Sequence, residues 1–215
     1  MKGTKELQLG TKYIEDKQYD KALTQFLLSS EEGNYFATYN IACMYYFGDG
    51  VEQNEAKAYE YFSKARSQGD AEATNRMAAM LAQGIGVKKN LDEAFKLYLE
   101  AAENKSLSGM ANVSVCYLEG IGTNVNIEEG LKWLELASSK GNGVASKLFA
   151  DYYYEGKYVS KDINKCIEYL ERGRKQKYGP AVLELARFYE EGIGVEKNIQ
   201  IANELKEEEK NIVID

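Results

Sequence analysis

Glycine recurs along this chain at one fixed interval, which constrains the fold more than any other feature. The first series, spaced by 36 residues, consists of Gly48, Gly84, Gly120, Gly156 and Gly192. A second series follows two residues later, at Gly50, Gly86, Gly122 and Gly194, with Tyr158 at the one position that breaks it. A strict period of this length predicts an array of structural repeats. Such arrays present extended surfaces, and each repeat contacts mainly its neighbours.

Each repeat divides into two helical segments, which we call helix A, before the glycines, and helix B, after them. In helix A, apolar residues recur four positions apart, as at Ala37, Ile41 and Tyr45, which is typical of one buried helical face. A glycine after helix A suits the left-handed conformation in which many helices end. Helix B follows an asparagine or aspartate, whose side chain can accept hydrogen bonds from free backbone N–H groups. These predicted N-cap residues are Asn54, Asn90, Asn126, Asp162 and Asn198.

The period also places the boundaries of the units. Residues 1–33 are expected to form a shortened helix pair, as suits a cap. The expected full repeats cover residues 34–69, 70–105, 106–141 and 142–177, and residues 178–215 form a partial repeat with a C-terminal cap. We expect all of them to build one continuous all-α domain.

Composition excludes several classes of function. The net charge of −7 argues against sequence-independent binding of nucleic acid, which needs a basic surface. No apolar run approaches the roughly 20 residues of a membrane-spanning helix. The first residues lack the apolar core of a secretion signal, so we expect a cytoplasmic protein without membrane insertion.

Catalysis is not expected from this sequence. It contains no histidine, the commonest general base and metal ligand. Cys43, Cys116 and Cys166 occupy positions that hold small or apolar residues in other repeats, so we expect free structural thiols in a reducing compartment. We therefore predict a protein that is not an enzyme and that needs no cofactor or metal.

The residues of the repeat carry a family resemblance. The second unit has the fullest pattern, with Ala73, Met77, Ala78, Gly84, Gly86, Val87, Asn90, Ala94, Tyr98 and Ala101. This pattern resembles the Sel1-like repeat, whereas the N-terminal pair, with Leu9, Gly10, Tyr13, Ala22 and Phe26, is more similar to a tetratricopeptide repeat. The resemblance implies a right-handed α-solenoid of antiparallel helix pairs, with about five 36-residue repeats and the A helices along the concave side. Gly130 and Gly173 depart from the pattern at alanine positions, where a glycine costs about 1 kcal/mol and is expected to reduce local rigidity.

The resemblance implies a non-catalytic scaffold or adaptor that binds another protein or peptide segment through the concave helix-A surface. Helix-A positions that packing between repeats does not fix supply the candidate contacts, among which tyrosine suits a partner interface. The candidate contacts are Tyr39, Cys43, Tyr46, Asn75, Ala79, Leu118, Lys147, Asp151 and Tyr154. Packing against the next repeat is the alternative role for each of these side chains.

The break in the second glycine series gives another candidate surface. Tyr158 lies close in sequence to the Tyr152–Tyr154 run, so a local surface at this elbow is a further hypothesis. The sequence does not decide between the concave face and the Tyr152–Tyr158 elbow as the main binding surface. A homodimer formed through an end of the solenoid is a further possibility. The alternative functions are an immunity protein that neutralises a secreted toxin, which some bacterial proteins resembling this one are, and a small-molecule-binding module.

Overall fold

The computed structural model describes residues 2–212; the first residue of the first predicted unit, Met1, and the last residues of the last one, 213–215, lie outside the described residues. Within that range the chain forms twelve α-helices and no strand, which confirms the predicted all-α class. The helices are α1 (Thr4–Glu15), α2 (Tyr19–Glu31), α3 (Tyr35–Phe47), α4 (Glu55–Ser67), α5 (Ala71–Gln83), α6 (Leu91–Glu103), α7 (Leu107–Glu119), α8 (Ile127–Ser139), α9 (Gly143–Glu155), α10 (Ile163–Lys175), α11 (Gly179–Glu191) and α12 (Ile199–Lys210).

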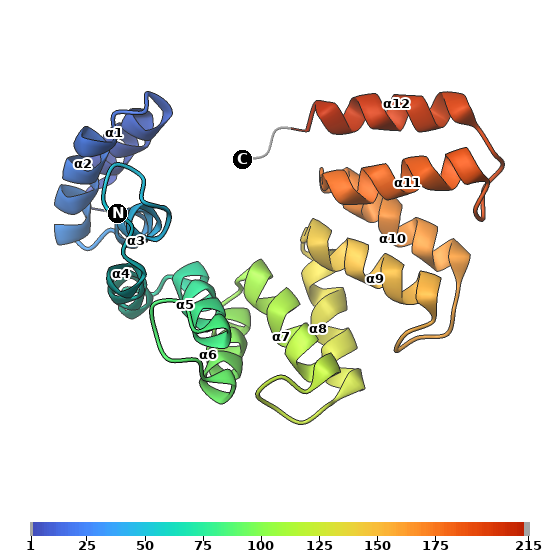
Figure 1. Ribbon diagram of the computed structural model, residues 1–215, viewed down its shortest axis with the longest axis horizontal. Helices are drawn as coiled ribbons and strands as arrows, with labels where there is room; N and C mark the ends of the chain where they lie inside the picture. The colour runs from blue at the N-terminus through green and yellow to red at the C-terminus, as the bar shows by residue number, and fades with distance from the viewer. Residues whose placement is uncertain (1, 213–215) are drawn as a thin grey trace. The chain divides into compact units, whose positions relative to one another are not determined.

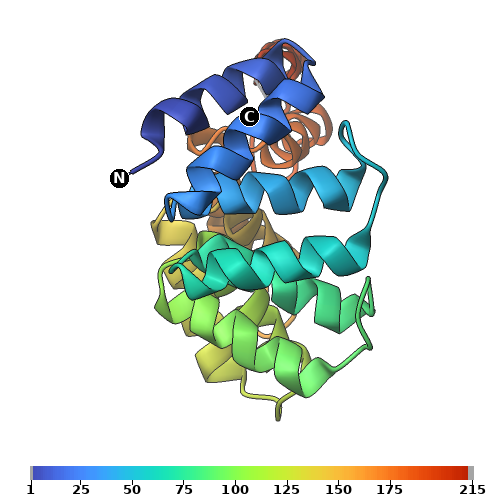
Figure 2. The same cartoon turned by 90° about the vertical axis from the view of Figure 1, so that its left-hand side faces the viewer.

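The chain divides into two compact units. The first unit comprises residues 1–109 and 121–123, and the second comprises residues 110–120 and 124–215. In the first unit, α1 to α6 pack as successive helical hairpins in chain order (Figures 1 and 2). In the second unit, α8 to α12 pack in the same manner, and α9 also contacts α11 (Figure 1). The odd-numbered helices from α3 to α11 are the A helices, and the even-numbered ones from α4 to α12 are the B helices.

Both ends of the loop between helix A and helix B are fixed as the sequence predicts. The glycines of the first series have φ near +80°, and the Gly48 N–H donates to the Met44 carbonyl oxygen at 2.9 Å. Each predicted N-cap side chain accepts a hydrogen bond from the third residue of helix B, as Asn90 does from the Glu93 N–H at 3.1 Å. The loop therefore ends one helix and begins the next with its own residues.

Glycine recurs in the second series for a different reason: a side chain at these positions would have no room. Each of these loops crosses the first turn of the second helix of the preceding unit, which is α2 for Gly50 and a B helix for Gly86, Gly122 and Gly194. A Cβ added to Gly86 would lie 2.5 Å from the Glu55 carbonyl carbon, and one added to Gly122 would lie 2.5 Å from the Leu91 carbonyl carbon. The φ of Gly122 is +66°, so this position requires glycine both for its backbone conformation and for its neighbours.

Gly130 and Gly173 also have packing reasons that the sequence alone did not reveal. A Cβ on Gly130 would lie 2.6 Å from Leu118 Cγ, and one on Gly173 would lie 2.7 Å from Ala181 Cβ. Both glycines are buried. They let neighbouring helices approach closely, which gives glycine a packing role at these two positions.

Candidate protein-interaction surfaces

A small groove lies between two A helices of the first unit, and we call it the α3–α5 groove. Its residues are Cys43, Tyr46, Phe47, Phe62, Arg76, Ala79, Met80 and Gln83, and its volume is about 80 Å³. Cys43, Tyr46 and Phe47 share one side of α3, because residues three and four apart on a helix are neighbours. The structure thus brings together three of the predicted contacts, Cys43, Tyr46 and Ala79.

Exposed aromatic side chains mark the α3 side of this groove. Phe47 is 61% exposed, and its ring lies edge-on to that of Tyr46 with centroids 5.0 Å apart. Phe36, at the other end of α3, is 50% exposed. Of these two phenylalanine rings, only that of Phe47 lines the groove.

Tyr39 links the two helices at the groove. Its hydroxyl oxygen accepts a hydrogen bond from Arg76 Nε at 3.1 Å, and its ring lies edge-on to the buried Phe62 ring at 5.4 Å. Burial raises the pKa of Tyr39 to about 12, so the phenol stays protonated at neutral pH. Tyr39 therefore serves packing and also holds the arginine beside the groove.

Two of the predicted contacts are buried. Asn75 is 5% exposed, and its amide donates to Glu72 Oε1 at 3.1 Å. Leu118 is 2% exposed and packs over Gly130, inside the second unit. Both side chains are buried, Asn75 beside Glu72 of its own helix and Leu118 against Gly130 of its own repeat, and neither presents a free surface to a partner.

The predicted contacts of the second unit lie in a charged setting on α9 and α11. Lys147 Nζ is 2.6 Å from Asp151 Oδ1. On α11, Arg187 pairs with Glu184 at 2.6 Å and with Glu191 at 3.1 Å. The Arg187 guanidinium also lies 5.7 Å from the centre of the Tyr154 ring. These charges are matched within the unit, in contrast to the α3–α5 groove.

Tyr158, at the break in the glycine series, has a left-handed backbone with φ +62°. Its hydroxyl donates to Glu119 Oε1 at 2.6 Å, and Lys157 Nζ donates to the same oxygen at 2.8 Å. Its ring lies edge-on to that of Tyr152, with centroids 5.0 Å apart. The elbow is therefore a small polar cluster whose hydroxyl and carboxylate already satisfy each other.

We predict that removing the Tyr158 hydroxyl changes the acidity of Glu119. Hydrogen bonds from Lys157 and then Tyr158 hold the pKa of Glu119 below its ordinary value. The cluster therefore stabilises the fold above the unfolded pKa of Glu119 and loses that contribution as the pH falls through the folded pKa. In a carboxyl NMR titration, Tyr158→Phe should raise the pKa of Glu119, and Lys157→Gln should raise it further. An unchanged pKa in Tyr158→Phe would show that this hydrogen bond does not persist in solution.

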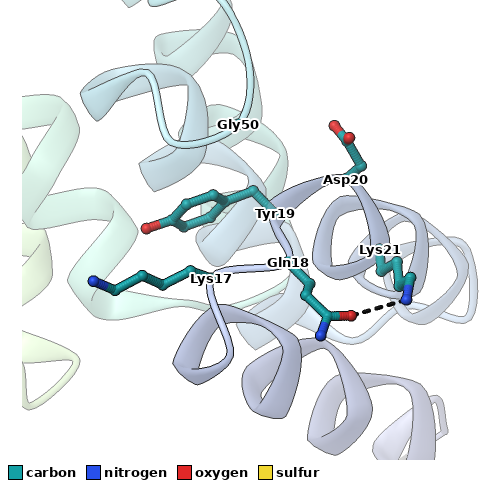
Figure 3. Close-up of a pocket in the computed structure, with 6 residues that line it drawn as sticks. All are labelled: Lys17, Gln18, Tyr19, Asp20, Lys21 and Gly50. Carbon is teal, nitrogen blue, oxygen red and sulfur yellow. Dashed lines mark hydrogen bonds between the residues drawn. The ribbon is translucent and has the colours of Figure 1, made fainter.

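A larger hollow of about 450 Å³ lies at the turn between α1 and α2, beside the α3–α4 loop. Its lining residues are Lys17, Gln18, Tyr19, Asp20, Lys21 and Gly50 (Figure 3). Lys17 and Tyr19 extend to one side, whereas Asp20 and Lys21 extend to the other (Figure 3). Lys21 Nζ donates to Gln18 Oε1 at 2.9 Å. The charged ends do not converge on one point, so this hollow lacks the arrangement that would hold a small ligand.

The three thiols differ in accessibility. Cys116 and Cys166 are buried, and desolvation raises their pKa values to about 11 and about 12. Cys43 is half-buried in the α3–α5 groove, and burial also raises the pKa of its thiol. All three are free, as the sequence predicts. Among residues 2–212, no helix is both long and apolar enough to cross a membrane.

Phe47 and Arg76 line the groove, although the repeat pattern of the sequence did not point to them. Phe36, Asn40, Cys43 and Phe47 lie at helical spacing and form one stripe on α3. From this spacing, the sequence could have indicated that Phe47 lies on the same face of α3 as Cys43. Arg76 had no such signal, because its role depends on which carboxylates reach it in the fold.

Solved structures of similar fold span most of the chain. A Sel1 repeat protein from Oxalobacter formigenes is 30% identical, with a TM-score of 0.75, and the match covers 95% of this chain and 82% of that one. A protective antigen of uropathogenic Escherichia coli with an SLR fold is 25% identical, with a TM-score of 0.76; the match covers 97% of this chain and 46% of the antigen. An immunity protein from Pseudomonas aeruginosa is 25% identical, with a TM-score of 0.63 and coverage of 81% and 64%, respectively.

Family models give a direct assignment of the repeats. No curated protein matches the chain. The model of the Sel1 repeat, in contrast, matches residues 36–70, 71–106, 107–142, 145–178 and 179–205. These five matches follow the 36-residue glycine period and account for most of the chain. The protein therefore belongs to the Sel1 repeat family, and its fold is an all-α solenoid.

Proposed function

We propose that this chain is a non-catalytic scaffold that binds a partner protein through its helix-A surface, chiefly at the α3–α5 groove. The exposed Phe47 ring beside a hollow lined by Tyr46, Cys43 and Ala79 is the observation that carries the proposal. Sel1 repeat proteins generally act as protein-interaction scaffolds, which supports the same role here. An aromatic side chain next to a pocket is the usual composition of an interface hot spot.

The proposed surface keeps most of the contacts suggested by the sequence. In the first unit it comprises Tyr39, Cys43, Tyr46 and Ala79, with Phe47 added. In the second unit, Lys147, Asp151 and Tyr154 form a separate candidate contact whose charges are already paired. Asn75 and Leu118 are excluded because they are buried. The Tyr158 elbow is a secondary candidate, since its polar groups bond to one another.

Affinity capture from an extract of the source cells tests this function. We expect wild-type protein to retain a partner that Phe47→Ser loses, because a serine cannot fill an apolar partner surface. Val125→Ser is the matched control, since Val125 is 58% exposed and lies outside the groove. The same partner should slow the alkylation of Cys43 by a maleimide. Equal capture by the two serine variants, or an unprotected Cys43 in the complex, would place the interaction elsewhere.

A second candidate function is that of an immunity protein that neutralises a toxin. The similarity to the Pseudomonas aeruginosa immunity protein favours it, and a net charge of −7 would suit a basic toxin. Expression of the genes adjacent to this one, singly and together with it, tests this role. Growth arrest by a neighbour that this chain relieves would support neutralisation, whereas absence of any toxic neighbour would leave the scaffold function alone.

A further inference from the structure

Arg76 is an exposed cation beside the α3–α5 groove, held in place by Tyr39 and not by an ion pair. Its Nε–H donates to the Tyr39 hydroxyl oxygen at 3.1 Å. A guanidinium carries five N–H groups, and across residues 2–212 no carboxylate lies within ion-pair distance of Arg76. Its remaining N–H groups are therefore available at the edge of the hollow.

The carboxylate that would ordinarily pair with Arg76 is engaged elsewhere. Glu72 precedes Arg76 by one helical turn, a spacing that favours an ion pair. Glu72 Oε1, however, accepts from Asn75 Nδ2 at 3.1 Å, and Oε2 accepts from Ser106 Oγ at 2.9 Å. Each oxygen of Glu72 thus accepts a hydrogen bond from a residue other than Arg76.

The hollow next to Arg76 is apolar and small. Its walls include Phe62, Ala79 and Met80, and its volume is about 80 Å³. A space of this size accepts a single side chain rather than a whole ligand. Phe47, 61% exposed, adds an apolar rim on the opposite side from Arg76. The groove therefore combines one apolar hole with one cation.

The equivalent surface of the second unit lacks this combination. Arg187, on α11, uses its guanidinium on Glu184 and Glu191. Lys147 is paired with Asp151. A partner carboxylate arriving there would have to displace a carboxylate of the chain itself, and the net gain would be small. The unmatched charge of the first unit thus distinguishes the two surfaces.

We infer that the α3–α5 groove selects a partner segment that carries an aspartate or glutamate close to an apolar side chain. The apolar side chain enters the hollow, and the carboxylate accepts charge-assisted hydrogen bonds from Arg76. Tyr39 acts as a positioning residue that fixes the guanidinium in advance, which lowers the entropy lost on binding. This inference rests on the proposed protein-binding function and specifies the chemistry of the partner.

Selection from a random peptide library on the immobilised protein tests the inference. Enriched peptides should contain an acidic residue within a few positions of leucine, isoleucine, methionine or phenylalanine. Arg76→Gln should weaken the binding of such a peptide about tenfold or more, since a charge-assisted hydrogen bond to the peptide carboxylate is lost. Tyr39→Phe should weaken it by a smaller factor, because the cation stays but its fixed orientation is lost. Arg187→Gln is the matched control and should leave the affinity unchanged.

Several results would overturn the inference. These are enrichment of neutral or basic peptides, equal binding by Arg76→Gln, or no enrichment at all. A dimer in solution that Phe47→Ser dissociates would show that a second copy occupies the groove instead. Far-ultraviolet circular dichroism should show that Arg76→Gln is folded, since Arg76 is exposed. A cellular partner that Phe47→Ser loses but Arg76→Gln retains would keep the proposed function and reject only the role of the carboxylate.

Discussion

Gly122→Ala should destabilise the first unit by about 3 kcal/mol. The left-handed backbone at φ +66° costs an alanine about 1–2 kcal/mol. The added Cβ would lie 2.5 Å from the Leu91 carbonyl carbon and closer still to the carbonyl oxygen. Both are backbone atoms, so the loop or the first turn of α6 must shift, at a further cost of about 1–3 kcal/mol. Urea unfolding followed by circular dichroism measures the loss.

Gly69→Ala separates the two causes in this prediction. Gly69 also has a left-handed backbone, with φ +96°, but no atom lies within 4 Å of a Cβ added there. It should therefore lose only the conformational part, about 1 kcal/mol. Tyr158, at the position equivalent to Gly122, gains contacts with Glu119 and Tyr152 that an alanine cannot make. If the two variants lost equal free energy of unfolding, the backbone at Leu91 would move away from the added Cβ at no measurable cost.

Phe188→Ala should destabilise the second unit by about 3–5 kcal/mol, the usual cost of deleting a buried phenylalanine ring. Phe188 is 0% exposed on α11, and its ring lies 5.6 Å from that of Tyr154 on α9. The Arg187 guanidinium lies 5.2 Å from the same ring. The cavity would therefore open where α9 meets α11, and thermal or urea unfolding of the variant measures the effect.

Phe188→Leu provides the comparison for this cavity. It keeps most of the apolar volume, so its loss should be clearly smaller than that of the alanine variant. If both variants unfolded at the wild-type urea concentration, the Phe188 ring would not be part of a packed core. The Tyr154 contact would then be a feature of the surface.

The architecture could be predicted from the sequence because the determinants of each repeat are local. Gly48 and its equivalents end helix A, and Asn90 and its equivalents cap helix B, within a few residues of where each acts. The spacing of apolar residues then fixes which face of each helix is buried. Repetition of these signals every 36 residues made the family assignment possible before any contact was known.

The chemistry of the groove could not be predicted in the same way. Arg76 is unpaired because Glu72 bonds to Ser106, which lies 34 residues further along the chain. The spacing of Glu184 and Glu191 from Arg187, by contrast, favours the ion pairs that the structure shows, so this contrast between the two arginines could be read only in part from the sequence. Leu118 is buried because Gly130 lets α8 come close to it. The states of Arg76 and Leu118 depend on contacts between different helices and loops, which a repeat period does not specify.

The glycines that follow α2, α4 and α8 can serve a purpose unrelated to binding. Gly33, Gly69 and Gly141 have left-handed backbones, are exposed, and leave open space where a side chain would stand. Lys105 and Lys177 already occupy the equivalent positions with positive φ, so the chain itself carries long side chains there. Exposed turns of this kind tolerate insertions well. Fluorophores or epitope tags introduced at these turns should report on each repeat separately while leaving the packing of the A helices intact.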